Sequence, residues 1–201
     1  MVPFAGYHMP LQYKGLRIEH HAVRKSLGVF DVSHMGEFWV KGPDALAFLQ
    51  SVISNDVAKL TSGKIQYACL PNAHGGIVDD LLVYCESESI YLLVVNASNM
   101  AKDMAWLAGH ARGFDIKICD ASLETSLLAV QGPKAAEAMQ SLTEVNLADM
   151  AYYTYTWGRF AGVDGVLISA TGYTGSGGVE LYIPQGKAPQ VWDAILEAGQ
   201  S

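Results

Sequence analysis

Apolar residues recur along this chain with two different periods, and the changes of period mark the predicted elements. Residues 16–27 (LRIEHHAVRKSL) have the pattern of an amphipathic helix, which we expect to end at Gly28. The next stretch, 29–42 (VFDVSHMGEFWVKG), alternates well enough to predict one strand. Helical periodicity returns in DALAFLQSVIS (44–54) and in APQVWDAILEA (188–198).

Turn-rich segments between apolar runs predict two β-hairpins. KIQYACL and GIVDDLLVYCE flank PNAHGG, and SIYLLVVNA predicts a third strand after them. A helix capped by Asn96 or Ser98 should follow and continue to about Arg112. Near the end of the chain, GVLISATGYTGSGGVELYIP (165–184) has the pattern of a second hairpin.

The second half of the chain repeats the plan of the first. VKGPDALAFLQS (40–51) and VQGPKAAEAMQS (130–141) share Val, Gly, Pro, Ala, Gln and Ser at a constant spacing of 90 residues. Each half then reads strand, Gly-Pro, helix, hairpin and helix, whereas a doubly wound sheet alternates strands and helices regularly. We therefore predict an internally duplicated α+β fold.

Composition and charge exclude several classes of function. The 201 residues are 50% hydrophobic and 16% charged, which is a globular composition. A net charge of −7 argues against a nucleic-acid partner. No apolar run approaches the ~20 residues of a membrane helix, and the N-terminus has no secretory-signal pattern. The three cysteines and six histidines lack metal-ligand spacing, so we expect reduced thiols and no metal.

The glycine-rich segment TGYTGSGG (171–178) is interpreted as a hairpin turn and not as a phosphate-binding loop. It lacks G-K-[ST], and a strand pattern follows it, whereas a phosphate loop opens a helix. On that strand Glu180 and Tyr182 share a face. A carboxylate near Tyr173 could receive the donor edge of a planar heterocycle, although a solvated strand face would carry the same residues.

Two adjacent carboxylates, Asp79 and Asp80, stand at the start of an apolar strand and should point to opposite faces. Burying an unpaired carboxylate is costly, so a buried one implies a partner, a shifted pKa or a polar cavity. The sequence favours Asp80 as the cavity residue, because Tyr84 shares its face and Tyr67 lies on the preceding strand. The alternative is that both carboxylates lie at an exposed strand end.

Several segments together, FAGYHMP, VFDVSHMGEF, GGIVDDLLVY, VVNASN, VQGP and TGYTGSGGVELY, resemble the aminomethyltransferase (T-protein) family of the glycine cleavage system. The resemblance implies a duplicated folate-binding α+β fold. Residues 1–40 with 121–201 would form one discontinuous subdomain, and 41–120 an inserted ferredoxin-like subdomain. Family members are longer at both ends and carry a further β-rich domain, so we expect this chain to be truncated and inactive by itself.

The resemblance implies that tetrahydrofolate, as a substrate, takes a methylene group from the aminomethylated lipoyl arm of the H-protein while ammonia is released. The family's catalytic aspartate corresponds to Asp80, and Glu180 matches the acidic residue that holds the pterin. The implied partners are lipoylated H-protein and tetrahydrofolate, in the bacterial cytoplasm or the mitochondrial matrix. Five positions match residues that line the folate cavity, with core packing as the alternative for each tyrosine: Tyr67, Tyr84, Asn96, Tyr173 and Met35.

The chain departs from the family pattern at one loop. Where many relatives read RTGYTGEDG, this chain has ATGYTGSGG, so that Ala170, Ser176 and Gly177 replace an arginine and two acids. Two other function classes stay open: a folate-binding module that assists iron–sulfur maturation, and the folate-binding part of an amine-oxidising flavoenzyme. The first class carries a KGCYxGQ-like signature whose cysteine TGYTGSG lacks, and no dinucleotide fingerprint supports the second.

Overall fold

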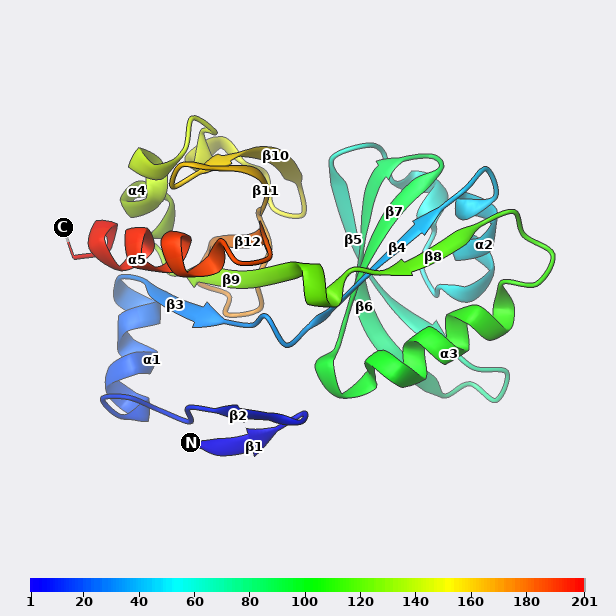
Figure 1. Ribbon diagram of the computed structural model, residues 1–201, viewed down its shortest axis with the longest axis horizontal. Coiled ribbons are helices and arrows are strands. Elements are labelled where there is room, and N and C mark those ends of the chain that lie inside the picture. Colours follow the sequence, from blue (N-terminus) through cyan, green and yellow to red (C-terminus); the bar gives the residue numbers. More distant parts are fainter. Residues whose placement is uncertain (201) are drawn as a thin grey trace. The chain divides into compact units, whose positions relative to one another are not determined.

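The computed structural model describes residues 1–200, which form two compact units (Figure 1). Unit 1 comprises Met1–His34 and the chain from Glu124 onward, and unit 2 comprises Met35–Leu123. Each unit contains one five-stranded sheet, and every pairing in both sheets is antiparallel. The predicted mixture of strands and helices is confirmed.

Unit 2 has the strand order β5-β6-β7-β4-β8. Helices α2 and α3 pack on one face of this sheet, where Phe48 and Leu107 join strand residues such as Phe38, Leu81 and Leu93 in one core. Without β5, the unit follows a β-α-β-β-α-β order. Its elements are β4 (Gly36–Lys41), α2 (Ala45–Val52), η1 (Val57–Lys59), β5 (Lys64–Pro71), β6 (Ile77–Ser87), β7 (Ile90–Val95), η2 (Ala97–Asn99), α3 (Met100–His110) and β8 (Lys117–Asp120).

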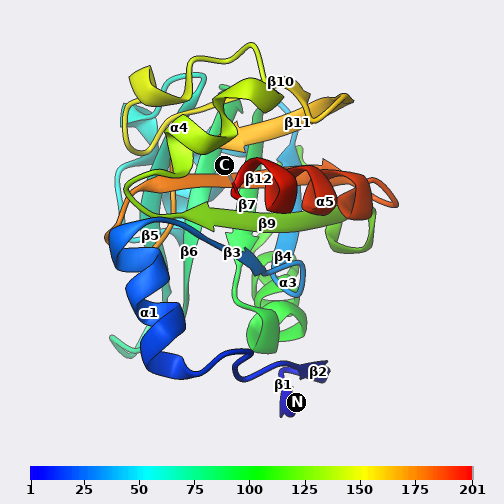
Figure 2. The same ribbon diagram turned by 90° about the vertical axis from the view of Figure 1, so that its left-hand side faces the viewer.

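Unit 1 has the corresponding order β10-β11-β12-β9-β3, which Figure 2 shows from the side of α5. The edge strand that follows α3 in unit 2 is supplied here by β3, from the N-terminal part of the chain. Its elements are β1 (Val2–Phe4), β2 (Tyr7–Met9), α1 (Leu16–Lys25), β3 (Gly28–Asp31), η3 (Ser122–Glu124), β9 (Thr125–Gln131), α4 (Ala135–Met139), η4 (Gln140–Leu142), η5 (Leu147–Asp149), β10 (Tyr155–Phe160), β11 (Val163–Ser169), β12 (Gly178–Pro184) and α5 (Ala188–Ala198), with η3 beginning before the unit boundary.

The Gly-Pro sequence of each repeat forms the same turn. Gly42 and Gly132 have φ angles of 144° and 139°. A Cβ atom on either glycine would lie 2.2 Å from a backbone oxygen, that of Asp115 or that of Ser26. Both the positive φ and the close approach of another segment therefore require glycine at these two positions.

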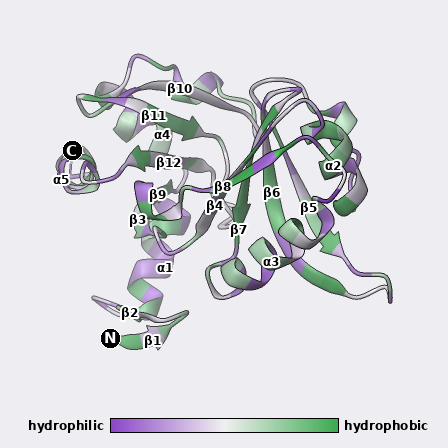
Figure 3. Ribbon diagram, turned by 45° about the vertical axis from the view of Figure 1, so that its right-hand side comes forward, coloured by the Kyte–Doolittle hydropathy of each residue, from purple (hydrophilic) through white to green (hydrophobic). Residues whose placement is uncertain are grey.

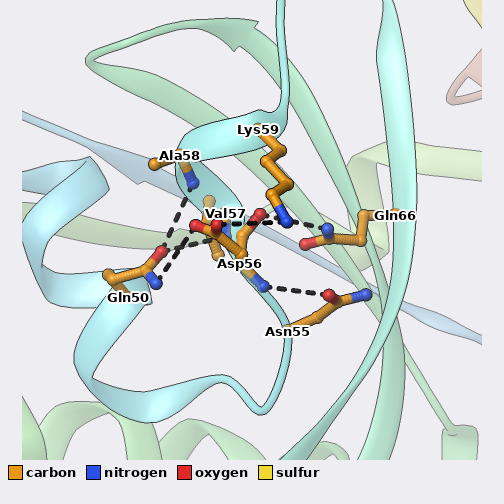
Figure 4. A network of polar contacts seen from close by, with 7 residues as sticks. All are labelled: Gln50, Asn55, Asp56, Val57, Ala58, Lys59 and Gln66. Carbon is orange, nitrogen blue, oxygen red and sulfur yellow. Dashed lines mark hydrogen bonds and ion pairs between the residues drawn. The ribbon is translucent and has the colours of Figure 1, made fainter.

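The repeated glutamine also has the same role in both units. The side-chain oxygen of Gln50 accepts hydrogen bonds from the backbone N–H groups of Val57, at 2.9 Å, and Ala58, at 3.3 Å (Figure 4). That of Gln140 accepts one from the N–H of Leu147 at 3.0 Å. Each glutamine satisfies donors at the start of a short 3₁₀ helix. The sequence repeat is therefore a structural duplication.

The single strand predicted over 29–42 is wrong. It is two strands, β3 and β4, and the chain leaves the sheet of unit 1 after Asp31 and enters that of unit 2 at Gly36. The subdomain boundary predicted after residue 40 falls inside β4. This strand pairs with β7 and β8, so all of it belongs to the sheet of unit 2. Alternation of apolar and polar residues cannot reveal a change of sheet when both segments alternate.

Hydropathy follows this architecture (Figure 3). Strands β6 and β7 are mostly apolar, and five of the six residues of β7 are buried. Helix α1 carries many hydrophilic residues and buries none of its side chains. Among residues 1–200, no helix is both long and apolar enough to cross a membrane.

Candidate functional site

The two aspartates at the start of β6 lie in different surroundings, as strand alternation predicts. Asp79 is 6% exposed and shares its face with Leu81 and Val83, which belong to the helix-covered core. Asp80 is partly exposed and pairs across the ladder with Cys69 of β5. The alternative in which both carboxylates lie at an exposed strand end is wrong for Asp79.

Two neutral donors hold the Asp80 carboxylate, one on each oxygen. The Tyr67 hydroxyl donates to Oδ2 at 2.9 Å, and the Asn96 amide donates to Oδ1 at 2.9 Å. Tyr67 is half-exposed, and its hydrogen bond to Asp80 is the main reason that its pKa is raised to about 12. The phenol therefore stays protonated at neutral pH and remains a donor. The structure brings together three of the predicted site residues.

The same asparagine also binds the buried aspartate. Asn96 donates to Asp79 from its backbone N–H at 3.3 Å and from its side-chain amide at 3.1 Å, and Asn99 adds a donor at 2.7 Å. Burial acts to raise the pKa of Asp79, but hydrogen bonds to its carboxylate, including those from Asn96 and Asn99, outweigh it, and the pKa lies below its usual value. Asn96 is the N-cap residue of η2, which leads into α3, as the sequence allowed, but its side chain makes no capping hydrogen bond.

In unit 1, Glu180 lies on β12 between Ser169 of β11 and Ala129 of β9. It is 9% exposed, and the Thr171 hydroxyl donates to its Oε2. Burial raises the pKa of Glu180, and the Thr171 hydrogen bond offsets part of that increase. Glu180 borders a small hollow that is open to solvent. The hollow is lined by Phe30, Val32, Ala129, Gln131, Gly172, Tyr173, Thr174 and Glu180.

A buried glutamine holds the loop beside this hollow. Gln131 donates from Nε2 to the carbonyl oxygens of Thr171, at 3.1 Å, and Val179, at 3.3 Å. Its Oε1 accepts a hydrogen bond from the Thr174 hydroxyl at 2.9 Å. A Cβ on Gly172 would lie 2.1 Å from the same oxygen, so a larger residue would displace the glutamine. Residues 171–178 form the predicted hairpin turn, and the buried side chain of Gln131 holds it in place.

The outer side of this loop is attached to α1. Arg24 donates from Nη1 to the carbonyl oxygen of Thr174 at 2.8 Å and to the hydroxyl of Ser176 at 2.7 Å. Ser176 is one of the positions that depart from the family pattern, and here it serves as an acceptor for this arginine. Tyr173 lies between these anchor points and is 91% exposed.

The other predicted site residues have less specific surroundings. Tyr84 is 1% exposed, a value that suits core packing. Its role in lining a cavity stays a prediction. Met35 is partly buried. Of the predicted site residues, Glu180 and Tyr173 line the hollow of unit 1. A role in folate binding stays a prediction for all of them.

Sequence reasoning missed two buried acids in unit 2. Asp103 is 0% exposed on α3, and its position three residues after Met100 and four before Leu107 places it on the buried stripe of that helix. Glu37 is 1% exposed on β4, and burial, followed by the charge of Asp120, raises its pKa to about 8. Across residues 1–200, no group of three or more His, Cys, Asp or Glu side chains could hold a metal ion.

The fold defines a class of domain with two units of the same antiparallel α+β plan, each with a hydrogen-bonded carboxylate on its sheet. The family model described as the GCVT N-terminal domain matches residues 1–201, and the chain belongs to this family. The family resemblance inferred from the sequence motifs is confirmed.

Curated relatives include the aminomethyltransferases of Flavobacterium psychrophilum and Bacteroides thetaiotaomicron. They are 56% and 57% identical over 200 and 201 residues, and each match covers 100% of this chain and 55% of the relative. The chain therefore spans about half the length of the curated relatives it matches.

Solved structures show the same relationship. The glycine cleavage system aminomethyltransferase T from Bartonella henselae matches with a TM-score of 0.88 and 35% identity, over 97% of this chain and 52% of that one. The heterotetrameric sarcosine oxidase of Corynebacterium sp. U-96 matches with a TM-score of 0.66 at 15% identity, over 92% of this chain and 90% of that one. The second likeness shows a shared fold alone.

Proposed function

We propose that the protein carrying this chain is the aminomethyltransferase of a glycine cleavage system. It transfers a methylene group from the aminomethylated lipoyl arm of the H-protein to tetrahydrofolate and releases ammonia. The observation that carries the proposal is the Asp80 carboxylate, which is oriented at both oxygens by neutral donors and remains partly exposed. The identity to two bacterial aminomethyltransferases supports it and favours the bacterial cytoplasm as its location.

Asp80 supplies the negative charge that this reaction needs. The carbon and nitrogen of the aminomethyl group acquire cationic character as the C–N bond breaks, and a carboxylate placed beside them can stabilise that charge. Tyr67 and Asn96 fix the orientation of the carboxylate without neutralising it, since both donors are uncharged. The described residues form two ion pairs, and neither of them involves Asp80. They are Lys59–Asp56 and Arg159–Asp164. A fixed charge stabilises a cation without reorganisation, and a carboxylate can also accept a proton from a folate nitrogen.

Glu180 is assigned to binding the pterin. A pterin presents a ring N–H and an exocyclic amino group side by side, and one carboxylate can accept both hydrogen bonds. Glu180 borders the hollow of unit 1, and the lining of this hollow includes the aromatic residues Phe30 and Tyr173, a residue type that suits a flat ring. Burial raises the pKa of Glu180, and two N–H donors from a ligand would favour its ionised form.

Release of ammonia from aminomethylated H-protein tests the proposal. The full-length protein is incubated with this substrate, with and without tetrahydrofolate, and ammonia and methylenetetrahydrofolate are quantified together. We expect equal amounts of the two products and a strict dependence on both the lipoylated carrier and the folate. A protein that binds tetrahydrofolate but forms neither product would be a non-catalytic folate-binding module, and the proposal would be wrong.

A further inference from the structure

Asp103, in the first turn of α3, has no function in the mechanism described so far. Its side chain is fully buried, and neither carboxyl oxygen has a hydrogen-bond donor among the residues that the structure describes. An ionised carboxylate in such a place is strongly unfavourable, because nothing replaces the water that it has lost. A protonated carboxyl group avoids this cost if its O–H finds an acceptor.

The acceptor beside Asp103 is the carboxylate of Asp79. Asn99 at the start of α3 donates to Asp79 Oδ1 at 2.7 Å, and Asp103 follows four residues later on the same side of the helix. The charged groups that act on Asp103 are Asp79, Lys102 and Asp80. Lys102 is turned to the carbonyl oxygen of Val78, to which its ammonium group donates a hydrogen bond. Two neighbouring carboxyl groups share one proton more easily than they both ionise.

The hydrogen bonds decide which of the two aspartates keeps the proton. Asp79 accepts N–H groups from the backbone and side chain of Asn96 and from the side chain of Asn99, and these donors stabilise its ionised form. Asp103 accepts no N–H group of the described residues. The negative charge therefore belongs on Asp79 and the proton on Asp103.

We propose that Asp103 is a protonated positioning residue that donates a hydrogen bond to Asp79 and thereby fixes Asn96 against Asp80. The side-chain amide of Asn96 contacts Asp79 Oδ1 at 3.1 Å, Asp80 Oδ1 at 2.9 Å and the Asp80 carbonyl oxygen at 3.1 Å. A shift of Asp79 would therefore move the donor that orients Asp80. The inference rests on the proposed function of Asp80 for its effect on turnover, but the protonation of Asp103 does not depend on it.

Titration of Asp103 follows from the same contacts. Burial is the main cause that raises the pKa of Asp103 to about 7; the hydrogen bond and the charge of Asp79 add to it, and Lys102 opposes it. Above that pH the proton leaves, and Asp79 and Asp103 then repel each other as two carboxylates. We expect Asn96 to lose its position, and turnover to fall, as the pH rises through this range.

Infrared spectra of the full-length wild type and of the Asp103→Asn variant, recorded below the pKa of about 7, test the protonation state. We expect a band of a protonated carboxyl group in the wild type that is missing from the variant. Other carboxyl groups with a raised pKa, such as that of Glu37, contribute equally to both infrared spectra and cancel in the difference spectrum. An identical band in both proteins would overturn the inference, whatever the protein's activity.

Turnover of Asp103→Asn and Asp103→Leu tests the positioning. Both substitutes are uncharged and close in size to Asp, but only Asn can donate a hydrogen bond to Asp79. We expect kcat of the Leu variant to be roughly 10- to 100-fold below that of the Asn variant, the range for one hydrogen bond to a charged group, with a similar KM for tetrahydrofolate. We also expect the wild type, but not Asp103→Asn, to lose kcat as the pH rises through about 7. Equal kcat values for the two variants would overturn the inference. If the Leu variant does not fold, the pH profile of Asp103→Asn decides. A fall in its kcat with rising pH like that of the wild type would then overturn the inference.

Discussion

The two units share a scaffold but hold their carboxylates in different ways. Both have the same strand order, the same Gly-Pro turn and the same glutamine at the start of a 3₁₀ helix. Glu180 pairs with Ala129, and the residue that pairs with Trp39, 90 positions before Ala129, is Leu92, so Glu180 has no acidic counterpart in unit 2. The repeat therefore accounts for the scaffold, whereas the chemistry depends on residues outside the repeat.

The surroundings of the two carboxylates suit different tasks. Asp80 is partly exposed and is held by a phenol and an amide, which orient a charge without cancelling it. Glu180 is buried, has a raised pKa, and borders a hollow whose lining includes two aromatic residues. We therefore assign the reaction to the carboxylate of unit 2 and ligand binding to that of unit 1.

The largest effect expected is on turnover, from Asp80→Asn in the full-length protein. Loss of the negative charge should lower turnover by ~10²- to 10⁴-fold, the usual scale for a positioned acid–base group, and leave tetrahydrofolate affinity almost normal. Asp79→Asn, on the other face of the strand, should cost far less turnover than Asp80→Asn, because Asp79 acts on the reaction only through Asn96. The measurement is ammonia release from aminomethylated H-protein. The reverse order of the two variants would show that the facing assignment is wrong.

The buried acid of β4 predicts a pH dependence of stability that belongs to unit 2. Burial and Asp120 raise the pKa of Glu37 from its ordinary 4.5 to about 8, so the folded state holds a proton in this interval that the unfolded state releases. The free energy of unfolding should therefore fall as the pH rises between these values, by about 1.4 kcal/mol for each pH unit at most.

Glu37→Gln should remove this dependence. The variant keeps the shape of the protonated side chain, and denaturant titrations of both proteins at several pH values provide the measurement. We expect the wild type to lose stability relative to the variant as the pH rises to about 8. Parallel stability curves for the two proteins would contradict the assignment of a protonated Glu37.

Glu180→Gln should weaken tetrahydrofolate binding by roughly 10- to 100-fold, because the amide can accept only part of the hydrogen bonding that a carboxylate offers to two N–H donors. Glu197→Gln, on the exposed side of α5, is the control of the same residue type in the same unit. Equilibrium titration with tetrahydrofolate measures both. If the affinity of Glu180→Gln matches that of the control, Glu180 does not belong to the binding site.

The smallest effects concern the shared scaffold. Gln50→Ala and Gln140→Ala each leave backbone donors of a 3₁₀ helix without an acceptor, which should lower the free energy of unfolding by about 1–3 kcal/mol. Gln185→Ala, at an exposed position, should change it little. Chemical denaturation provides the comparison. Very unequal losses for the two repeated glutamines would mean that the duplication preserves the turn but not its energetic role.

The sequence predicted the duplicated α+β plan because the two Gly-Pro repeats and the hairpin turns are local signals. It also predicted that Asp79 and Asp80 point to opposite faces of the strand, because successive side chains along a strand alternate between its two faces. The change of sheet between Asp31 and Gly36 was missed, since it depends on which strands pair and not on local pattern.

The polar partners were predicted less well. Asn96 was proposed both as a cap and as a site residue, and its contact with two carboxylates depends on the ladder between β6 and β7. Gln131 escaped attention because its hydrogen bond to Thr171 joins residues that lie 40 positions apart. Thr171 escaped attention because its contact with Glu180 depends on how the turn between them folds. Asp103 was the one partner with a sequence signal, an acid on the apolar stripe of a helix.

A structure of the full-length protein with a bound, non-reacting reduced folate tests the division of tasks most directly. The account predicts that the ring N–H and the amino group of the pterin lie within hydrogen-bonding distance of the Glu180 carboxylate, with Thr171 still donating to the same group. A pterin whose donor edge is bound by Asp80, or by any group other than Glu180, would contradict it.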